Sequence, residues 1–444
     1  MTTIELGELG SPGAGPDVDR RRRPDRRLIR RWGVAGATVL CLLAVTGSVR
    51  PQPRGIRPLW SVPMGQNMGT TLTADTVYLH QIVAGEPRLS AYDLATGDLR
   101  WSRHVDDPAG YLQTAVSGLL LLPTDRRTVP PAPGDQSSWA TDFAQSTTAL
   151  DPATGRTLWT VPGDVETLDV DTALMSDHAD DGRLRRLRLL RLSDQRTIWS
   201  RDVPGVRNRT VAVSGGRPDK IITTTDRGEI TVFRYADGAH VASARIPWIP
   251  PDPQTGTFTD VVAAGDVLVV NRTRPDVDDL RVYRLDTLTL VWTLRTAGDY
   301  PFGCGPAICL HDRSGVTSFE PLTGRVRWRL ATADHAWPVT PDRLILEASN
   351  GDGWSVFVDA ATGALVGEPG TGLSVWNGAP GAYVLVLSPT ASPPGRTSVT
   401  RWDLATGRRN LLGAIPALTE HNCQAVTGYL TCVRNDLLEV TAVG

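Results

Sequence analysis

The residues of this sequence that could perform chemistry are few and widely separated. Seven histidines and five cysteines are distributed over 444 residues. The sequence contains no His-Glu-x-x-His pair, no Gly-x-Ser-x-Gly elbow and no phosphate-binding Gly-x-x-x-x-Gly-Lys loop. Two acidic segments, residues 176–182 and 276–279, lack the ligand spacing of an EF-hand calcium loop and are interpreted as solvated hairpin turns. We therefore expect no enzyme activity, and no catalytic, cofactor-binding or metal-binding residue.

Four of the cysteines are expected to form two short-range disulfide bonds. Cys304 and Cys309 bracket one short hairpin pattern, and Cys423 and Cys432 bracket another. A zinc site is the alternative, but the spacing is not a paired Cys-x-x-Cys and no histidine lies in register. Disulfide bonds are typical of exported domains. The fifth cysteine, Cys41, lies in an apolar segment near the N-terminus.

A repeated eleven-residue pattern organises the chain that carries these residues. It reads AYDLATGDLRW at residues 91–101 and ALDPATGRTLW at residues 149–159. Alternating apolar and polar residues before the aspartate predict a strand, and the Asp-x-x-Thr-Gly segment predicts a tight turn. The tryptophan lies in a second strand. One copy cannot bury its apolar face, so successive copies must stack.

Eight copies can be aligned, and the average interval of about 44 residues is typical of four-stranded propeller blades. The aspartate position is occupied by Asp93, Asp151, Arg191, Arg234, Arg284, Glu320, Asp359 and Asp403. Eight residues later, five copies carry a tryptophan expected to dock one unit against the next: Trp101, Trp159, Trp199, Trp292 and Trp328. The other three copies carry Ala242, Gly367 and Leu411.

The pattern Ala-x-Asp-x-x-Thr-Gly-x-x-x-Trp resembles the tryptophan-docking repeat of the PQQ-dependent alcohol dehydrogenase propellers and of their non-catalytic, BamB-like relatives. The resemblance covers roughly residues 58–444 and implies an all-β propeller of four-stranded blades. Quinoprotein dehydrogenases of this fold carry a disulfide between adjacent cysteines beneath the quinone, and this sequence has no adjacent cysteines. The resemblance therefore implies a non-catalytic member without a cofactor.

The two termini are expected to close the ring together. Residues 57–62 resemble an outer strand without its partners, while residues 423–433 predict a hairpin and residues 437–443 one further strand. Taken literally, eight internal copies and a closing blade make nine. Because nine-bladed propellers are rare, we expect about eight blades.

The N-terminal region predicts a membrane anchor. Residues 1–31 form a polar arm with eight arginines, and residues 32–49 are an uncharged apolar run of 18 residues. A helix of that length spans ~27 Å, close to the ~30 Å hydrocarbon core. The arginines predict a cytoplasmic arm, followed by a linker at residues 50–58 and an extracytoplasmic propeller at residues 59–444. A cleaved signal peptide is the alternative, but no clean Ala-x-Ala site follows the run.

These features predict a single-pass plasma membrane protein whose propeller binds a protein or a cell-envelope ligand without catalysis. The alternatives are a quinone-dependent dehydrogenase with a non-standard site and a sensory ectodomain whose cytoplasmic arm contacts a partner or anionic lipid. A net charge of −2 gives no overall attraction to nucleic acid.

The ligand is expected on the face where second strands connect to third strands and each blade connects to the next. The longest irregular segments, residues 123–142, 246–257 and 388–397, are assigned to that face. Trp139 and Trp248 are the expected aromatic anchors.

Overall fold

The computed structural model describes residues 55–64, 69–106, 113–114, 118–130, 141–252, 254–274, 278–296, 300–312, 315–331, 333, 335–348, 354–376, 381–418 and 422–444. All described residues belong to one unit of the chain, residues 53–444. The expected basic arm (1–31) and membrane anchor (32–49) lie outside them. Within the described ranges, no helix is long and apolar enough to cross a membrane.

The described residues form 35 β-strands in seven four-stranded sheets and one seven-stranded sheet, which confirms an all-β fold. Two four-stranded sheets come first: β2 (Gly69–Leu72), β3 (Thr76–Val83), β4 (Glu86–Asp93) and β5 (Leu99–His104), then β6 (Gln113–Thr114), β7 (Leu120–Val129), β8 (Thr141–Leu150) and β9 (Thr157–Pro162). The seven-stranded sheet follows: β10 (Asp164–Leu168), β11 (Thr172–His178), β12 (Leu184–Arg191), β13 (Thr197–Ser214), β14 (Arg217–Thr225), β15 (Glu229–Arg234) and β16 (His240–Arg245).

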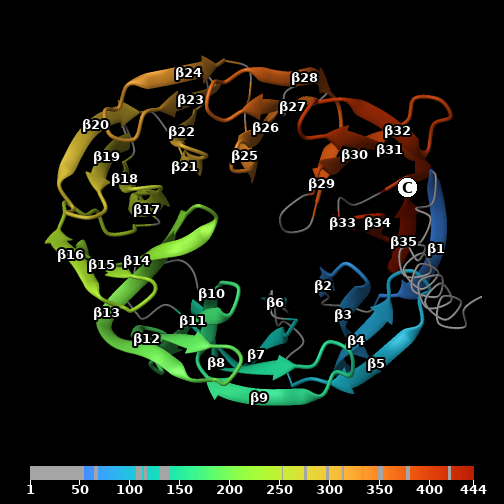
Figure 1. Cartoon of the computed structure of the whole chain (residues 1–444), viewed down its shortest axis with the longest axis horizontal. Helices are drawn as coiled ribbons and strands as arrows, with labels where there is room; N and C mark the ends of the chain where they lie inside the picture. The colour runs from blue at the N-terminus through green and yellow to red at the C-terminus, as the bar shows by residue number, and fades with distance from the viewer. Residues whose placement is uncertain are drawn as a thin grey trace, which may run out of the picture. The chain divides into compact units, whose positions relative to one another are not determined.

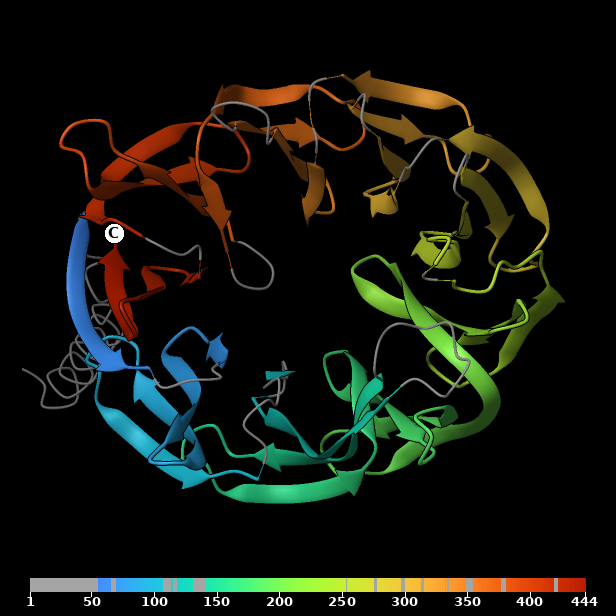
Figure 2. The ribbon, with the colours of Figure 1, turned by 180° about the vertical axis from the view of Figure 1, so that it is seen from behind.

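Four further four-stranded sheets continue the chain. The first two contain β17 (Phe258–Ala264), β18 (Val267–Thr273), β19 (Asp278–Arg284) and β20 (Leu290–Thr296), then β21 (Tyr300–Cys304), β22 (Ala307–Asp312), β23 (Gly315–Phe319) and β24 (Val326–Leu330). The next two contain β25 (His335–Thr340), β26 (Arg343–Ala348), β27 (Trp354–Asp359) and β28 (Leu365–Gly370), then β29 (Leu373–Val375), β30 (Tyr383–Pro389), β31 (Arg396–Asp403) and β32 (Arg409–Pro416). Within residues 53–444, the sheets follow one another around a ring, seen from its two sides in Figures 1 and 2.

The seven-stranded sheet contains two of the sequence repeats. Its central strand β13 is 18 residues long and pairs first with β12 and then with β14. Val206 has partners on both sides, Leu184 and Thr225, so the strand is shared by the two units. If the shared strand is counted twice, the described residues contain nine four-stranded units in eight sheets.

The Asp-x-x-Thr-Gly segments form the tight turns expected of them. In the first copy, the backbone N–H groups of Ala95 and Thr96 donate to the Asp93 carboxylate at 2.9 and 3.0 Å. The N–H of Gly97 donates to the Asp93 carbonyl oxygen at 2.9 Å, and Gly97 adopts a φ of 80°. Glycine tolerates this left-handed backbone better than other residues. The carboxylate therefore fixes the turn between the third and fourth strands of a unit.

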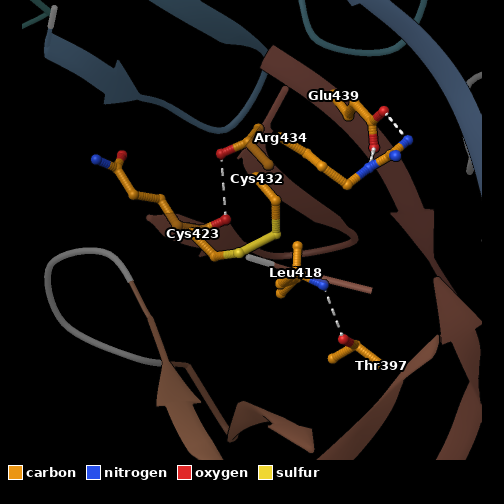
Figure 3. The surroundings of a disulfide bond; sticks show 8 residues. Thr397, Leu418, Cys423, Cys432, Arg434 and Glu439 are labelled. Carbon is orange, nitrogen blue, oxygen red and sulfur yellow. Dashed lines mark hydrogen bonds and ion pairs between the residues drawn. A yellow bond between two sulfur atoms is a disulfide. The ribbon is translucent and has the colours of Figure 1, made fainter. Parts of the chain in front are cut away.

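The last sheet joins the two ends of the described chain, as the sequence predicts. The N-terminal strand β1 (Ile56–Pro63) pairs with β35 (Leu437–Val443), followed inward by β34 (Tyr429–Arg434) and β33 (Cys423–Val426). Both expected disulfide bonds are present. Cys304–Cys309 joins β21 to β22, and Cys423–Cys432 joins β33 to β34. Figure 3 shows the second bridge beside the ion pair of Arg434 and Glu439.

Candidate functional site

Hydrophobic clusters lie between neighbouring sheets. The docking tryptophans repeat one geometry there. Four of the five expected tryptophans, and also Trp60 on β1, donate the indole N–H to the carbonyl oxygen that follows the aspartate position of the next unit. The bonds are Trp60 to Leu94 (3.1 Å), Trp101 to Pro152 (2.9 Å), Trp199 to Tyr235 (2.8 Å), Trp292 to Pro321 (2.8 Å) and Trp328 to Ala360 (3.0 Å). The N–H of each ring is thus satisfied within the fold.

Each of these rings also lies against the turn glycine of the next unit. A Cβ atom placed on Gly155 would lie 2.5 Å from the Trp101 ring, and one placed on Gly363 would lie 2.6 Å from the Trp328 ring. Such distances are far shorter than van der Waals contact. The turn glycine is therefore required both by its backbone conformation and by the adjacent tryptophan.

Trp159 and Trp292 differ from the expectation that all five tryptophans are largely buried, because both are only partly buried. Trp159 faces a turn in which Gln195, rather than glycine, occupies the left-handed position at a φ of 56°. In the described part of the chain, Trp159 makes no indole bond to the following unit. The longer side chain of Gln195 provides a physical reason for the looser contact.

The unit that carries Ala242 in place of tryptophan shows the inverse arrangement. The next turn has Leu288 at the glycine position, with a φ of 52°, and the Leu288 side chain is 5% exposed. Ala242 and Leu288 belong to the same hydrophobic cluster. A large residue on the turn and a small residue on the strand thus replace the usual small turn residue and large strand residue. Alignment of the repeats alone shows only that the copy with Ala242 lacks the tryptophan.

The loops assigned to the ligand face are shorter than expected because strands extend into them. Residues 123–129 belong to β7 and residues 141–142 to β8, which pair as far as Val129 and Thr141. Likewise, Ser388 and Pro389 continue β30, and β31 begins at Arg396. Residues 246–257 contain a short turn closed by the bridge between Asp252 and Thr257. The described parts of the first and third segments are thus in part paired strand rather than irregular insertion.

The two expected anchors have different outcomes. Trp139 lies outside the described residues. Trp248 is partly buried and packs on the cluster between β13–β16 and β17–β20, and its Nε1 atom is buried without a hydrogen-bond partner. It contributes to packing between two units. The Trp, Tyr and Phe side chains that are exposed in the described residues are Tyr300 and Trp337.

A cluster of ionisable groups, missed at the sequence level, lies where β10 begins and β11 ends. The N–H of Ala144 on β8 donates to the Asp164 carboxylate at 3.0 Å, which links β10 to the preceding sheet. Glu166 accepts hydrogen bonds from Ser176 and from Arg209 on β13, which links β10 to the following unit. These contacts span three successive units. The bonded residues are 10 to 43 positions apart in the sequence, so no local spacing could reveal the cluster.

Two members of the cluster have perturbed pKa values. Burial, and then the positive charge of Arg209, lowers the pKa of His178 to about 4, so its imidazole is neutral at pH 7. Burial is also the main cause that raises the pKa of Asp164. The His178 ring lies 4.7 Å from the Phe143 ring on β8. Perturbed pKa values are common at functional sites. Here, however, the carboxylates of Asp164 and Glu166 accept hydrogen bonds from the protein itself. The arrangement suits a structural junction better than acid–base catalysis.

The nearby hairpins are held together on the same side of the sheets. Arg127 on β7 forms a 2.8 Å ion pair with Asp180 in the β11–β12 turn. On β11 and β12, the largely buried pair of Asp177 and Arg188 is also separated by 2.8 Å. The first pair joins two units and the second holds one hairpin together, while Arg188 also donates to the Pro162 carbonyl oxygen of the preceding unit.

Two shallow surface depressions lie elsewhere. One, of about 470 Å³, is lined by β3, β4 and β5 and includes Gln81, Arg88 and Tyr92. The other, of about 400 Å³, lies beside Gly367 and Gly407. Among the described residues, no group of three or more His, Cys, Asp and Glu side chains could hold a metal ion.

The comparisons with known proteins establish the family. A protein-family profile described as outer membrane protein assembly factor BamB matches residues 45–179 and 144–410. The chain belongs to this BamB family. The resemblance inferred from the repeat is thereby confirmed. No curated protein matches the chain.

Solved structures similar to this BamB-family chain include proteins of very different activity. BamB from Moraxella catarrhalis is 15% identical, covering 68% of this chain and 99% of that chain at a TM-score of 0.38. The dihydro-heme d1 dehydrogenase NirN is 14% identical, covering 70% and 68% at a TM-score of 0.40. The computationally designed Ika8 protein is 10% identical, covering 82% and 100% at 0.43. Values this low carry no argument about function.

Proposed function

We propose that this chain is a membrane-anchored, extracytoplasmic propeller that acts as a non-catalytic scaffold for a protein of the cell envelope. The observation that carries the proposal is the BamB family match over most of the repeat region. The family is described as that of an outer membrane protein assembly factor. The same fold also hosts enzymes, so the site has to support the assignment.

The arrangement of the polar residues supports binding rather than catalysis. In the cluster around Asp164 and Glu166, both carboxylates are engaged in hydrogen bonds between units. The neighbouring hairpins are linked by the ion pair of Arg127 and Asp180, and the second hairpin is held by the largely buried pair of Asp177 and Arg188. A preformed surface reduces the conformational entropy that a partner must lose on binding. We assign the partner to the face formed by these hairpins.

The membrane topology is part of the proposal. The arginines of residues 1–31 precede an apolar run at residues 32–49 long enough to span a bilayer. The two disulfide bonds at Cys304–Cys309 and Cys423–Cys432 agree with an oxidising compartment. Alkaline phosphatase fused after Gly444 should therefore be active. An inactive fusion, with an active cytoplasmic reporter at the same point, would place the propeller on the other side.

Scaffold function is tested by cross-linking a tagged full-length chain in membranes and identifying the captured proteins by mass spectrometry. We expect a specific protein partner whose capture weakens with Trp139→Ala. The matched control is Leu365→Ala on the outer strand β28, which should capture the partner normally. Failure of the wild-type chain to capture any specific protein would contradict the proposal. Dye reduction after incubation with PQQ and calcium would instead favour a dehydrogenase.

A further inference from the structure

The two exposed aromatic side chains lie on neighbouring sheets, each near the beginning of an innermost strand. Tyr300 is the first residue of β21, and Trp337 is the third residue of β25. Tyr300 is 65% exposed and Trp337 is 52% exposed. Figure 1 shows β21 and β25 on the inner side of the ring. Exposed tyrosine and tryptophan are the residue types most enriched at binding hot spots.

Histidines link the two positions: His311 lies across from Tyr300, and the rings of His311, His335 and Trp337 form a row. His311 on β22 is the cross-strand partner of Tyr300, so both side chains lie on the same face of that sheet. The His311 and His335 rings are stacked, with centroids 5.2 Å apart and planes at 26°. The His335 and Trp337 rings are also stacked, at 6.1 Å and 24°. The row therefore crosses from one unit to the next and ends at the half-exposed indole of Trp337.

A carboxylate accompanies the end of the row. The Trp337 indole N–H donates to Glu347 Oε2 at 3.2 Å, from the neighbouring strand β26. Among the described residues, no arginine, lysine or histidine forms an ion pair with Glu347. The second carboxylate oxygen is therefore not engaged by a cation of the described fold. An exposed indole face and a carboxylate that pairs with no cation of the described residues are thus placed side by side.

The geometry selects a planar cation as the ligand. The ring at the end of the row leaves a face for one more flat group, and the adjacent Glu347 carboxylate favours a cation. A guanidinium group is planar, stacks on aromatic faces and also bonds carboxylates. The fold itself uses this contact twice: the guanidinium carbon of Arg401 lies 4.5 Å from the Tyr383 ring centroid, and that of Arg409 lies 4.2 Å from the Trp402 ring centroid.

We propose that the row formed by Tyr300, His311, His335 and Trp337, together with Glu347, binds an arginine side chain of the partner protein. The guanidinium stacks on the free face of Trp337 and bonds to the Glu347 carboxylate. This inference rests on the proposed scaffold function, because it names the chemistry by which that partner is recognised. It adds a binding position that the repeat pattern does not contain.

The test uses the full-length chain and small probes, so it is independent of partner capture. Ligand-observed NMR compares N-acetyl-arginine amide with N-acetyl-citrulline amide, which has the same shape without the charge. We expect saturable binding of the arginine probe and much weaker binding of citrulline. In a spectrum of the protein, the arginine probe should shift the Trp337 indole resonance. Glu347→Gln should weaken arginine binding about tenfold, because a charge-assisted hydrogen bond is lost. Trp337→Ala should abolish binding, and Trp337→Phe should retain part of it through the aromatic face.

Leu365→Ala is the matched control, because Leu365 is 54% exposed on β28 of the same sheet. It should bind the arginine probe like the wild type. Equal binding of arginine and citrulline, or undiminished binding by Trp337→Ala, would overturn the proposal. A larger shift of the Trp337 indole resonance with a soluble glycan than with the arginine probe would also overturn it. If the arginine probe fails while membrane capture succeeds, this inference is wrong and the scaffold proposal stands.

Discussion

The contact between Trp101 and Gly155 makes a quantitative prediction about how the units are coupled. The Trp101 side chain is 9% exposed, and its N–H bonds to Pro152 at 2.9 Å. Replacing a buried tryptophan by alanine typically costs 3–5 kcal/mol, so Trp101→Ala should lower the free energy of unfolding by about 4 kcal/mol. The loss combines transfer of the ring to water with the cavity left beside the next unit.

Gly155→Ala should also destabilise, for two separate reasons. The φ of 67° at Gly155 costs about 1 kcal/mol for a residue with a Cβ atom. The new methyl group would lie 2.5 Å from the Trp101 ring, and such overpacking typically costs about 1–3 kcal/mol. The expected total is about 3 kcal/mol. Only the second contribution depends on the tryptophan.

The double variant separates these contributions. If Trp101 is removed first, the methyl group of Ala at position 155 enters the vacated space, so the combined loss should be about 2 kcal/mol smaller than the sum of the single losses. Urea denaturation of the full chain measures the three variants, provided that the slope of the transition is unchanged. Additive losses, within about 0.5 kcal/mol, would show that ring and glycine are not in the contact described here.

Three further predictions concern other parts of the fold. Ala242→Trp should destabilise by about 1–3 kcal/mol through overpacking, and Leu288→Gly in the same chain should recover most of this loss in thermal unfolding. Replacing Cys304 and Cys309 by serine should cost about 2 kcal/mol, because the closed loop is short; thermal unfolding of the oxidised wild type and the variant checks this, and peptide mapping without reduction should show the bridge. The pKa of His178 in the folded chain, about 4, lies below its ordinary value of 6.5. As the pH falls, the unfolded chain therefore binds the proton first, and the free energy of unfolding decreases between about pH 6.5 and pH 4. Because the ring is partly exposed, we expect a loss of about 2 kcal/mol rather than the full shift, and His178→Gln should remove this pH dependence from urea midpoints.

The sequence was sufficient for the four-stranded units, the turns and both disulfide bonds, because these depend on neighbours close in the chain. It led us to expect about eight units, whereas the described residues contain nine. Asp93 and Gly97 are four residues apart and determine one turn between them. The ionisable cluster depends on Glu166 and Arg209, which are 43 residues apart and meet only when successive units pack. The shared strand β13 was missed for a related reason. It continues through Pro204 and Gly205, residues that usually indicate a turn.

The described residues show two uses of tryptophan in this chain. A docking ring such as Trp101 donates its N–H to a backbone carbonyl of the next unit, which leaves it no polar group for a ligand. Trp248 is likewise committed to packing, despite the proline-rich sequence around it. Trp337 instead donates to the Glu347 carboxylate and leaves half of its surface exposed. Since a surface hydrogen bond of this kind adds little stability, Glu347→Gln should change the free energy of unfolding by less than about 0.5 kcal/mol. Urea denaturation of this variant, compared with Trp101→Ala, tests the distinction. A loss of several kcal/mol would make Glu347 part of the fold, and the row would no longer be a surface kept for a partner.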